Sequence, residues 1–240
     1  MEGLAGRIIN GAFAVWGRNL VSFSVLAVMI HIPVVAVQFA LAGQFDASDP
    51  SAVMTRSFIL VALNLTVGAL LSAALTWGVL EDLRDRRASF ADCLANGFSR
   101  MGPVLVVTLV ATLATMVATM ALVIPGIVVA MMLYIAVPAV VMEEVPAMEA
   151  LRRSAQLTEG SKWSLLAVAF GLLIVTVTLA WGGGYVIGTV VKEPTTAALL
   201  GEVLAALFAP LQAAAAAVAY FLLRQEREGV HLDELASIFD

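Results

Sequence analysis

Residues 101–142 read MGPVLVVTLVATLATMVATMALVIPGIVVAMMLYIAVPAVVM and contain no charged side chain. An α-helix needs about 20 residues to cross a bilayer, so a run of this length is enough for two spans. Proline and glycine interrupt helices, and the pair Pro125-Gly126 lies near the middle of the run. The stretch therefore predicts a tight transmembrane hairpin, with spans at 103–124 and 127–142 and a turn at Pro125-Gly126.

The rest of the chain has the same apolar character. Of the 240 residues, 61% are hydrophobic and 13% are charged, and the mean hydropathy is +0.98. Soluble domains are about 45–50% apolar and about 25% charged, so lipid is the expected solvent. Four further apolar runs predict spans at 20–42, 57–80, 165–191 and 197–223. We expect an all-α integral membrane protein with six transmembrane helices in three hairpins.

Residues 1–224 then form one membrane domain, and residues 225–240 form a short cytoplasmic tail. Eleven of the thirteen basic residues lie in the termini and in the loops on one side, while only Arg56 and Lys192 lie on the other. Because positively charged loops stay in the cytoplasm, this distribution predicts a bacterial plasma (inner) membrane protein with both termini cytoplasmic. The basic residues would meet anionic lipid headgroups, and the net charge of −5 argues against a nucleic-acid partner.

Three amphipathic segments precede the odd-numbered spans, at residues 3–17, 88–100 and 146–159. In the second segment Phe90 and Cys93 recur at helical spacing opposite Asp92. Such segments are typical of helices that lie in the membrane interface with their apolar faces toward the lipid. We therefore expect three interfacial helices on the cytoplasmic side.

Short blocks in the second half of the chain resemble a known family. They are IPGI at 124–127, AVPAVV at 136–141 followed by Glu143, ALRRS at 150–154, and AYFLLR at 219–224. These blocks resemble bacterial multi-pass proteins grouped with YciC and with the membrane domain of glycerophosphoryl diester phosphodiesterases. The resemblance implies a helical membrane fold and a general link to membrane integrity, without a defined molecular activity. The metal-binding carboxylates and histidines of the phosphodiesterase members have no counterpart here, so hydrolysis is not expected.

Few polar groups fall inside the predicted spans, and such groups indicate function by default because they are costly in hydrocarbon. His31 lies near the middle of the first span. One interpretation is a histidine bonded within the bundle, and the other is a proton- or ligand-linked site. Asn64, Glu202 and Gln212 complete a candidate intramembrane polar site, although hydrogen bonds between helices also explain them. An ion pair between His31 and Glu202 is not expected, since their depths differ by roughly 13 Å.

A candidate cytoplasmic contact motif consists of Glu143, Arg152, Arg153 and Ser154, in which Glu143 and Arg153 are near enough to form an ion pair. Two other patterns are open to more than one interpretation. Threonines at 108, 112, 115 and 119 share a helix face that either packs or lines a polar path. Gly182-Gly183-Gly184 indicates either close helix contact or a discontinuous helix.

Motifs for catalysis, for a cofactor or for a metal ion are not recognisable in the sequence, so we expect neither an enzyme nor a cofactor. The favoured function is a non-enzymatic membrane protein that organises or assists other plasma-membrane components, with a protein partner or a homo-oligomer as the expected assembly. The alternative is a small permease or a lipid or small-molecule transport protein. A cavity lined by His31 or Glu202 would favour the alternative.

Overall fold

The computed structural model describes residues 3–41, 44, 49–84, 86 and 89–229. Within these residues the chain is helical and contains no strand. The helices are α1 (Leu4–Arg18), α2 (Leu20–Leu41), α3 (Pro50–Leu83), α4 (Phe90–Ala121), α5 (Val123–Met132), α6 (Ala136–Glu143), α7 (Ala147–Leu157), α8 (Lys162–Val190) and α9 (Pro194–Glu228).

In the described part of the chain, six segments are long and apolar enough to cross a membrane. They are α2, α3, α4, the segment Val123–Glu143 that joins α5 and α6, α8, and the part of α9 at Val203–Glu228. The predicted fold class, an all-α membrane protein with six transmembrane helices, is therefore confirmed.

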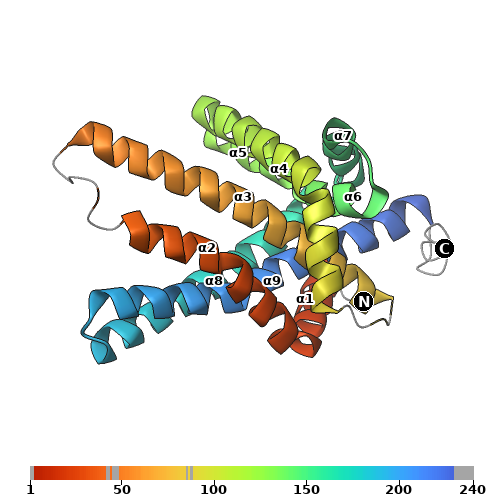
Figure 1. The fold of residues 1–240 in the computed structure, drawn as a ribbon. Helices are drawn as coiled ribbons and strands as arrows, with labels where there is room; N and C mark the ends of the chain where they lie inside the picture. Colours follow the sequence, from red (N-terminus) through yellow and green to blue (C-terminus); the bar gives the residue numbers. More distant parts are fainter. Residues whose placement is uncertain (1–2, 42–43, 45–48, 85, 87–88, 230–240) are drawn as a thin grey trace.

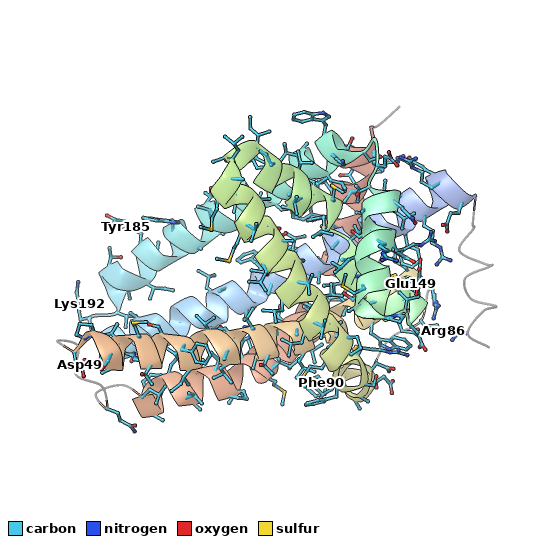
Figure 2. The ribbon with its side chains drawn as sticks, turned by 90° about the horizontal axis from the view of Figure 1, so that it is seen from above. Asp49, Arg86, Phe90, Glu149, Tyr185 and Lys192 are labelled. Atoms are coloured by element: carbon cyan, nitrogen blue, oxygen red, sulfur yellow. The ribbon has the colours of Figure 1, made fainter. Side chains whose placement is uncertain are left out.

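Three hairpins, α2–α3, α4–α5 and α8–α9, come together at one end of the molecule and diverge toward the other (Figure 1). Figure 2 places Arg86 and Glu149 at the first end, together with α6 and α7, and places Asp49 and Lys192 at the second. We name the first the basic end and the second the hairpin end. The hairpin α4–α5 stops short of the tips of the other two (Figure 1).

The turn of the α4–α5 hairpin is at Leu122, so the turn predicted at Pro125-Gly126 is wrong. Leu122 has an extended backbone (φ −161°, ψ 147°), and α5 begins at the next residue. Pro125 fits the first turn of α5, because the N–H groups there have no intrahelical partner. A Cβ at Gly126 would lie 2.9 Å from the Cα of Thr119. The glycine is therefore needed for close contact between the two helices, not for the turn.

The predicted span at 127–142 is divided into two helices, because α5 ends at Met132 and α6 begins at Ala136. The break leaves the carbonyl of Met132 without its usual helical donor. The hydroxyl of Ser154, near the end of α7, donates to this carbonyl at 2.7 Å. The hydroxyl of Thr158, the residue after α7, lies 3.3 Å from the same carbonyl and has a shorter hydrogen bond, at 2.8 Å, to the carbonyl of Ser154. Irregular backbone at membrane depth is stable only when protein groups satisfy it, and the hydroxyl of Ser154 does so here.

The predicted helix at 88–100 is not a separate element. Residues 90–100 are the first part of α4, which starts at the Ser89 cap and continues through Pro103, and Figure 1 shows that the helix is bent. Proline bends a helix because it removes one backbone hydrogen bond. By contrast, α1 and α7 are separate helices near the expected 3–17 and 146–159.

Two further expectations are wrong because α8 and α9 each continue as helix beyond a predicted break or end. Helix α8 runs without interruption through Gly182, Gly183 and Gly184, so a discontinuous helix is excluded there. Helix α9 extends to Glu228, so the segment 225–240 begins as helix, and residues 230–240 lie outside the described residues.

The core lies in the halves of the helices nearest the basic end. In α2 the buried side chains run from Phe23 to Val34, and in α8 from Leu165 to Leu172. Tyr220 and a run of alanines in α9 complete this core. Toward the hairpin end, large apolar side chains such as Phe58 and Trp181 are exposed, as expected where lipid covers the surface.

Candidate functional site

A cavity of about 340 Å³ lies between α2, α3, α6 and α9, next to the break between α5 and α6. Its walls come from one residue of α2 and from short stretches of the other helices. The lining residues are His31, Gly68, Leu71, Ser72, Leu75, Thr76, Tyr134, Val137, Pro138, Ala209, Gln212, Ala213 and Ala216. The cavity therefore lies where the core of the basic end gives way to the diverging hairpins.

The polar side chains of the cavity are uncharged groups that form hydrogen bonds. Gln212 contributes an amide, and Ser72 and Thr76 contribute hydroxyls. The hydroxyl of Tyr134 is buried and has no hydrogen-bond partner within the described residues. A buried hydroxyl without a partner costs about 1–3 kcal/mol, so a group that binds it would stabilise the protein.

His31 is oriented by its own helix. Its Nδ1 atom lies 2.9 Å from the carbonyl oxygen of Ala27, one turn earlier in α2. A carbonyl accepts only, so Nδ1 carries a proton, and Nε2 is an acceptor when the ring is neutral. This hydrogen bond lies within α2 and does not join two helices, and the ring also lines the cavity.

An apolar groove of about 270 Å³ borders His31 between α2 and α9. Its other lining residues are Val28, Ile32, Val35, Ala36, Val203 and Ala206. His31 lines both the polar cavity and this groove. The cavity and the groove are therefore neighbouring spaces with the His31 side chain in the wall of both.

The structure brings His31 and Gln212 to one cavity but separates Asn64 from them. The Asn64 amide is exposed on α3 and donates to the carbonyl of Leu60 in its own helix at 2.8 Å. Glu202 belongs to α9, but its side chain lies outside the described residues. On the predicted threonine face, Thr119 donates to the carbonyl of Thr115, which satisfies its hydroxyl locally.

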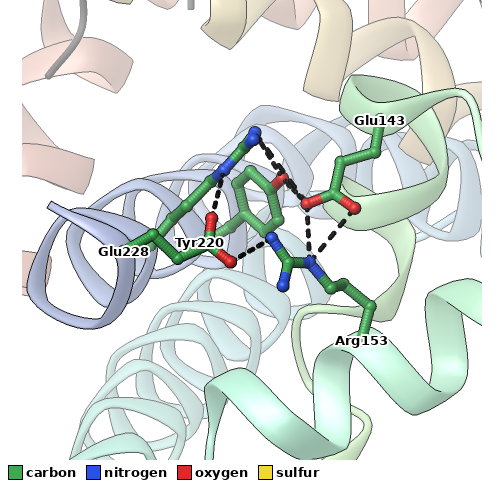
Figure 3. A network of polar contacts seen from close by, with 5 residues as sticks. Glu143, Arg153, Tyr220 and Glu228 are labelled. Atoms are coloured by element: carbon green, nitrogen blue, oxygen red, sulfur yellow. Dashed lines mark hydrogen bonds and ion pairs between the residues drawn. The ribbon is translucent and has the colours of Figure 1, made fainter. Parts of the chain in front are cut away.

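At the basic end, Glu143 is the centre of a polar network (Figure 3). The predicted ion pair with Arg153 is confirmed, with Nε at 2.9 and 3.2 Å from the two carboxylate oxygens. Tyr220 donates its hydroxyl to Glu143, and Arg224 lies 3.8 Å from the same carboxylate. Glu228 accepts from both Arg153 and Arg224. The network thus joins the end of α6 to α7 and α9.

Two carboxylates and two guanidinium groups balance their charges in this network. Burial lowers the pKa of Arg153, but hydrogen bonds and charge from Glu143 and Glu228 outweigh burial and raise that pKa above its ordinary value. Sequence reasoning did not assign Tyr220, Arg224 and Glu228 to the site. Tyr220 and Arg224 belong to the AYFLLR block, which was the available signal, whereas Glu228 was placed in the tail.

The other two members of the predicted contact motif, Arg152 and Ser154, lie in different environments. Arg152 is exposed and lines a polar hollow of about 600 Å³ with Glu143, Glu149, Arg153 and Gln156. Ser154 is buried and donates to Met132. The motif is therefore two features, a surface hollow and a structural hydroxyl, and not one site.

Comparison with family models, with curated proteins and with solved structures gives no match to this chain. Among the described residues, no group of three or more His, Cys, Asp or Glu side chains is placed to hold a metal ion.

Proposed function

We propose that this chain is a non-enzymatic multi-pass membrane protein that binds a lipid or another small molecule between its hairpins and handles it within the bilayer. The observation that carries the proposal is the cavity of about 340 Å³ lined by His31 and Gln212. Small-molecule sites have volumes of about 300–1,000 Å³ and combine apolar walls with a few polar groups. The sequence favours an organising role and gives a transport role as the alternative, and a cavity with His31 in its wall supports the alternative.

The proposal includes an orientation, with the basic end in the cytoplasm of a bacterial plasma membrane. The distribution of Lys and Arg supports it. Helices α1 and α7, which each bury one face, would then lie at the cytoplasmic interface, where exposed side chains such as Arg152 meet anionic headgroups. A relationship to the YciC-like proteins fits the same proposal.

The organising role remains a second candidate because of the polar hollow at the basic end. Arg152, Glu149 and Gln156 present both charges and an amide on one exposed surface of α7. Such a surface suits a protein partner or a second copy of the chain, and the network around Glu143 holds its helix in place.

The test is purification of the full chain from native membranes in nanodiscs, with mass spectrometry of bound lipids, small molecules and proteins. We expect one lipid or small molecule to be enriched over the bulk membrane. It should be lost from a Gly68→Leu variant, which fills the cavity, since a Cβ at Gly68 meets no atom within 4 Å. A stoichiometric protein partner without an enriched small molecule would contradict the proposal and favour the organising role.

A further inference from the structure

We infer that the ligand is an uncharged amphiphile, with its polar head in the cavity beside Gln212 and Tyr134 and a hydrocarbon chain in the groove between α2 and α9. This inference rests on the proposed function and specifies the chemical class of the ligand. It follows from three features of the site, namely the absence of charge, the donors and acceptors offered, and the shared position of His31.

The first feature is that the residues lining the cavity, within the described chain, carry no Lys, Arg, Asp or Glu side chain. A phosphate or carboxylate head would be buried here without a counter-charge, which is strongly unfavourable in a low-dielectric site. The closest guanidinium on α9, Arg224, is twelve residues from Gln212, about 18 Å along the helix. It is already paired with Glu228. The site therefore selects against anionic phospholipid heads.

The second feature is the set of hydrogen-bonding groups. The Gln212 amide both donates and accepts, and Nε2 of His31 accepts when the ring is neutral. A head with a hydroxyl group satisfies both, because a hydroxyl donates to Nε2 and can also donate to or accept from the amide.

The third feature is the position of the apolar groove. Six of its seven lining side chains are Val, Ile or Ala, and the seventh is His31. A chain attached to a head in the cavity therefore continues past His31 into the groove. Lipid tails are as apolar as these side chains, so the groove accommodates the chain without adding much affinity. Selectivity between lipids therefore comes from the polar head, so the test must compare lipids that differ only in the head.

The experiment uses purified full-length protein in nanodiscs that contain a trace of a photoactivatable lipid. Two probes carry the same diazirine-labelled acyl chains: a diacylglycerol, with a hydroxyl head, and a phosphatidylglycerol, with an anionic head. Labelled peptides are located by mass spectrometry with and without excess unlabelled diacylglycerol. We expect labelling of α2 and α9 peptides by the diacylglycerol probe that the competitor removes, and only background labelling by the phosphatidylglycerol probe.

Two pairs of variants locate the head. Gly68→Leu fills the cavity and should reduce competed labelling to background, whereas Gly171→Leu on α8, where a Cβ also meets no atom within 4 Å, should leave it unchanged. Gln212→Leu should weaken binding about tenfold, the change expected from the loss of one good hydrogen bond. Asn64→Leu removes an amide that bonds only its own helix and should have no effect.

Competed labelling of the same peptides by the phosphatidylglycerol probe would overturn the uncharged class and leave the proposed function in place. No competed labelling by either probe, with all variants folded, would overturn the inference, since the site would not hold an amphiphile. The native-nanodisc measurement then decides the proposed function independently, because an enriched ligand of other chemistry would still support it.

Discussion

The basic end and the hairpin end are held together in different ways. At the basic end, ion pairs join elements that are far apart in the sequence, and most of the buried side chains lie beneath them. These pairs are Arg7–Glu226, Arg18–Asp82, Arg100–Glu144 and the network around Glu143. Toward the hairpin end, the helices of α2–α3 and α8–α9 expose large apolar side chains, and the hairpins diverge (Figure 1).

This difference follows from the solvent that each end meets. Lipid tails offer no hydrophobic drive for helices to pack, so packing in the membrane depends on close contact and on polar groups. The polar contacts are concentrated at the basic end, and the hairpins therefore pack there and separate beyond it. The cavity lies between the part of the molecule where the hairpins pack together and the part where they separate. The predictions below test whether stability resides at the basic end.

The largest effect is expected from Glu143→Gln. The substitution leaves Arg153 and Arg224 with Glu228 as their remaining acidic partner in the network. Because the Glu143 side chain is only 14% exposed, we expect a loss of about 2–3 kcal/mol in the free energy of unfolding. Reversible unfolding in mixed detergent measures this loss. Glu149→Gln, on the exposed face of α7, is the control, and equal effects of the two variants would contradict a structural role for the network.

A pair of glycines compares the two ends directly. At Gly97, near the basic end, a Cβ would lie 2.8 Å from the Cβ and 3.2 Å from the backbone of Ala74. At Gly183, near the hairpin end, the obstructing atom is the end of the flexible Leu204 side chain. We expect Gly97→Ala to destabilise the protein by about 1–3 kcal/mol, and Gly183→Ala to be close to neutral. The same unfolding assay applies, and a reversed order would refute the comparison.

The break between α5 and α6 should depend on a hydroxyl that comes from outside those helices. Ser154→Ala leaves the carbonyl of Met132 without its closest side-chain donor. We expect a cost of about 1–2 kcal/mol, the penalty of a buried polar group without a partner. Thr119→Val, which removes a hydroxyl bonded only within α4, serves as the comparison. If both variants are equally stable, the Met132 carbonyl is satisfied by other means.

The smallest effect is expected at Asp49, the N-cap of α3 at the hairpin end. Hydrogen bonds from the Ser51 side chain and backbone lower the pKa of this carboxyl below its ordinary value. A carboxyl with a lowered pKa in the folded state stabilises the protein above its unfolded pKa, and this contribution disappears as the pH falls through the folded value. Asp49→Asn should slightly reduce the dependence of stability on pH below about 4, the ordinary Asp pKa. A large reduction in this pH dependence would mean that the hairpin end contributes much of the stability, against the comparison of the two ends.

The spans could be predicted because they depend on local composition alone. The predicted span 20–42 corresponds to α2 (Leu20–Leu41), and 165–191 to α8 (Lys162–Val190). The division of the fourth span could not be predicted, because the group that stabilises it is the hydroxyl of Ser154, more than twenty positions later in the chain. The turn was misplaced because proline was assigned to the turn when it also suits the first turn of a helix.

The candidate sites were predictable to different degrees. Glu143 and Arg153 are ten residues apart across a bend, so their pairing followed from short-range geometry. The proximity of His31 and Gln212 requires α2 and α9 to pack together, which no pattern in the sequence specified. Glu228 was missed because the end of α9 was placed near Leu223, more than one turn too early.

The one-residue turn at Leu122 also bears on how the protein enters the membrane. Its neighbours Met120, Val123 and Ile124 are apolar, whereas the other two hairpin tips carry Asp49 or Lys192. Moving an elementary charge through a membrane potential involves about 2.3 kcal/mol per 100 mV. With the basic end in the cytoplasm, as proposed, insertion of the α4–α5 hairpin would move no charge across the bilayer. The α2–α3 tip, with Asp46, Asp49 and Arg56, would move a net charge of −1 and so couple to the potential, whereas Lys192 and Glu193 cancel at the α8–α9 tip.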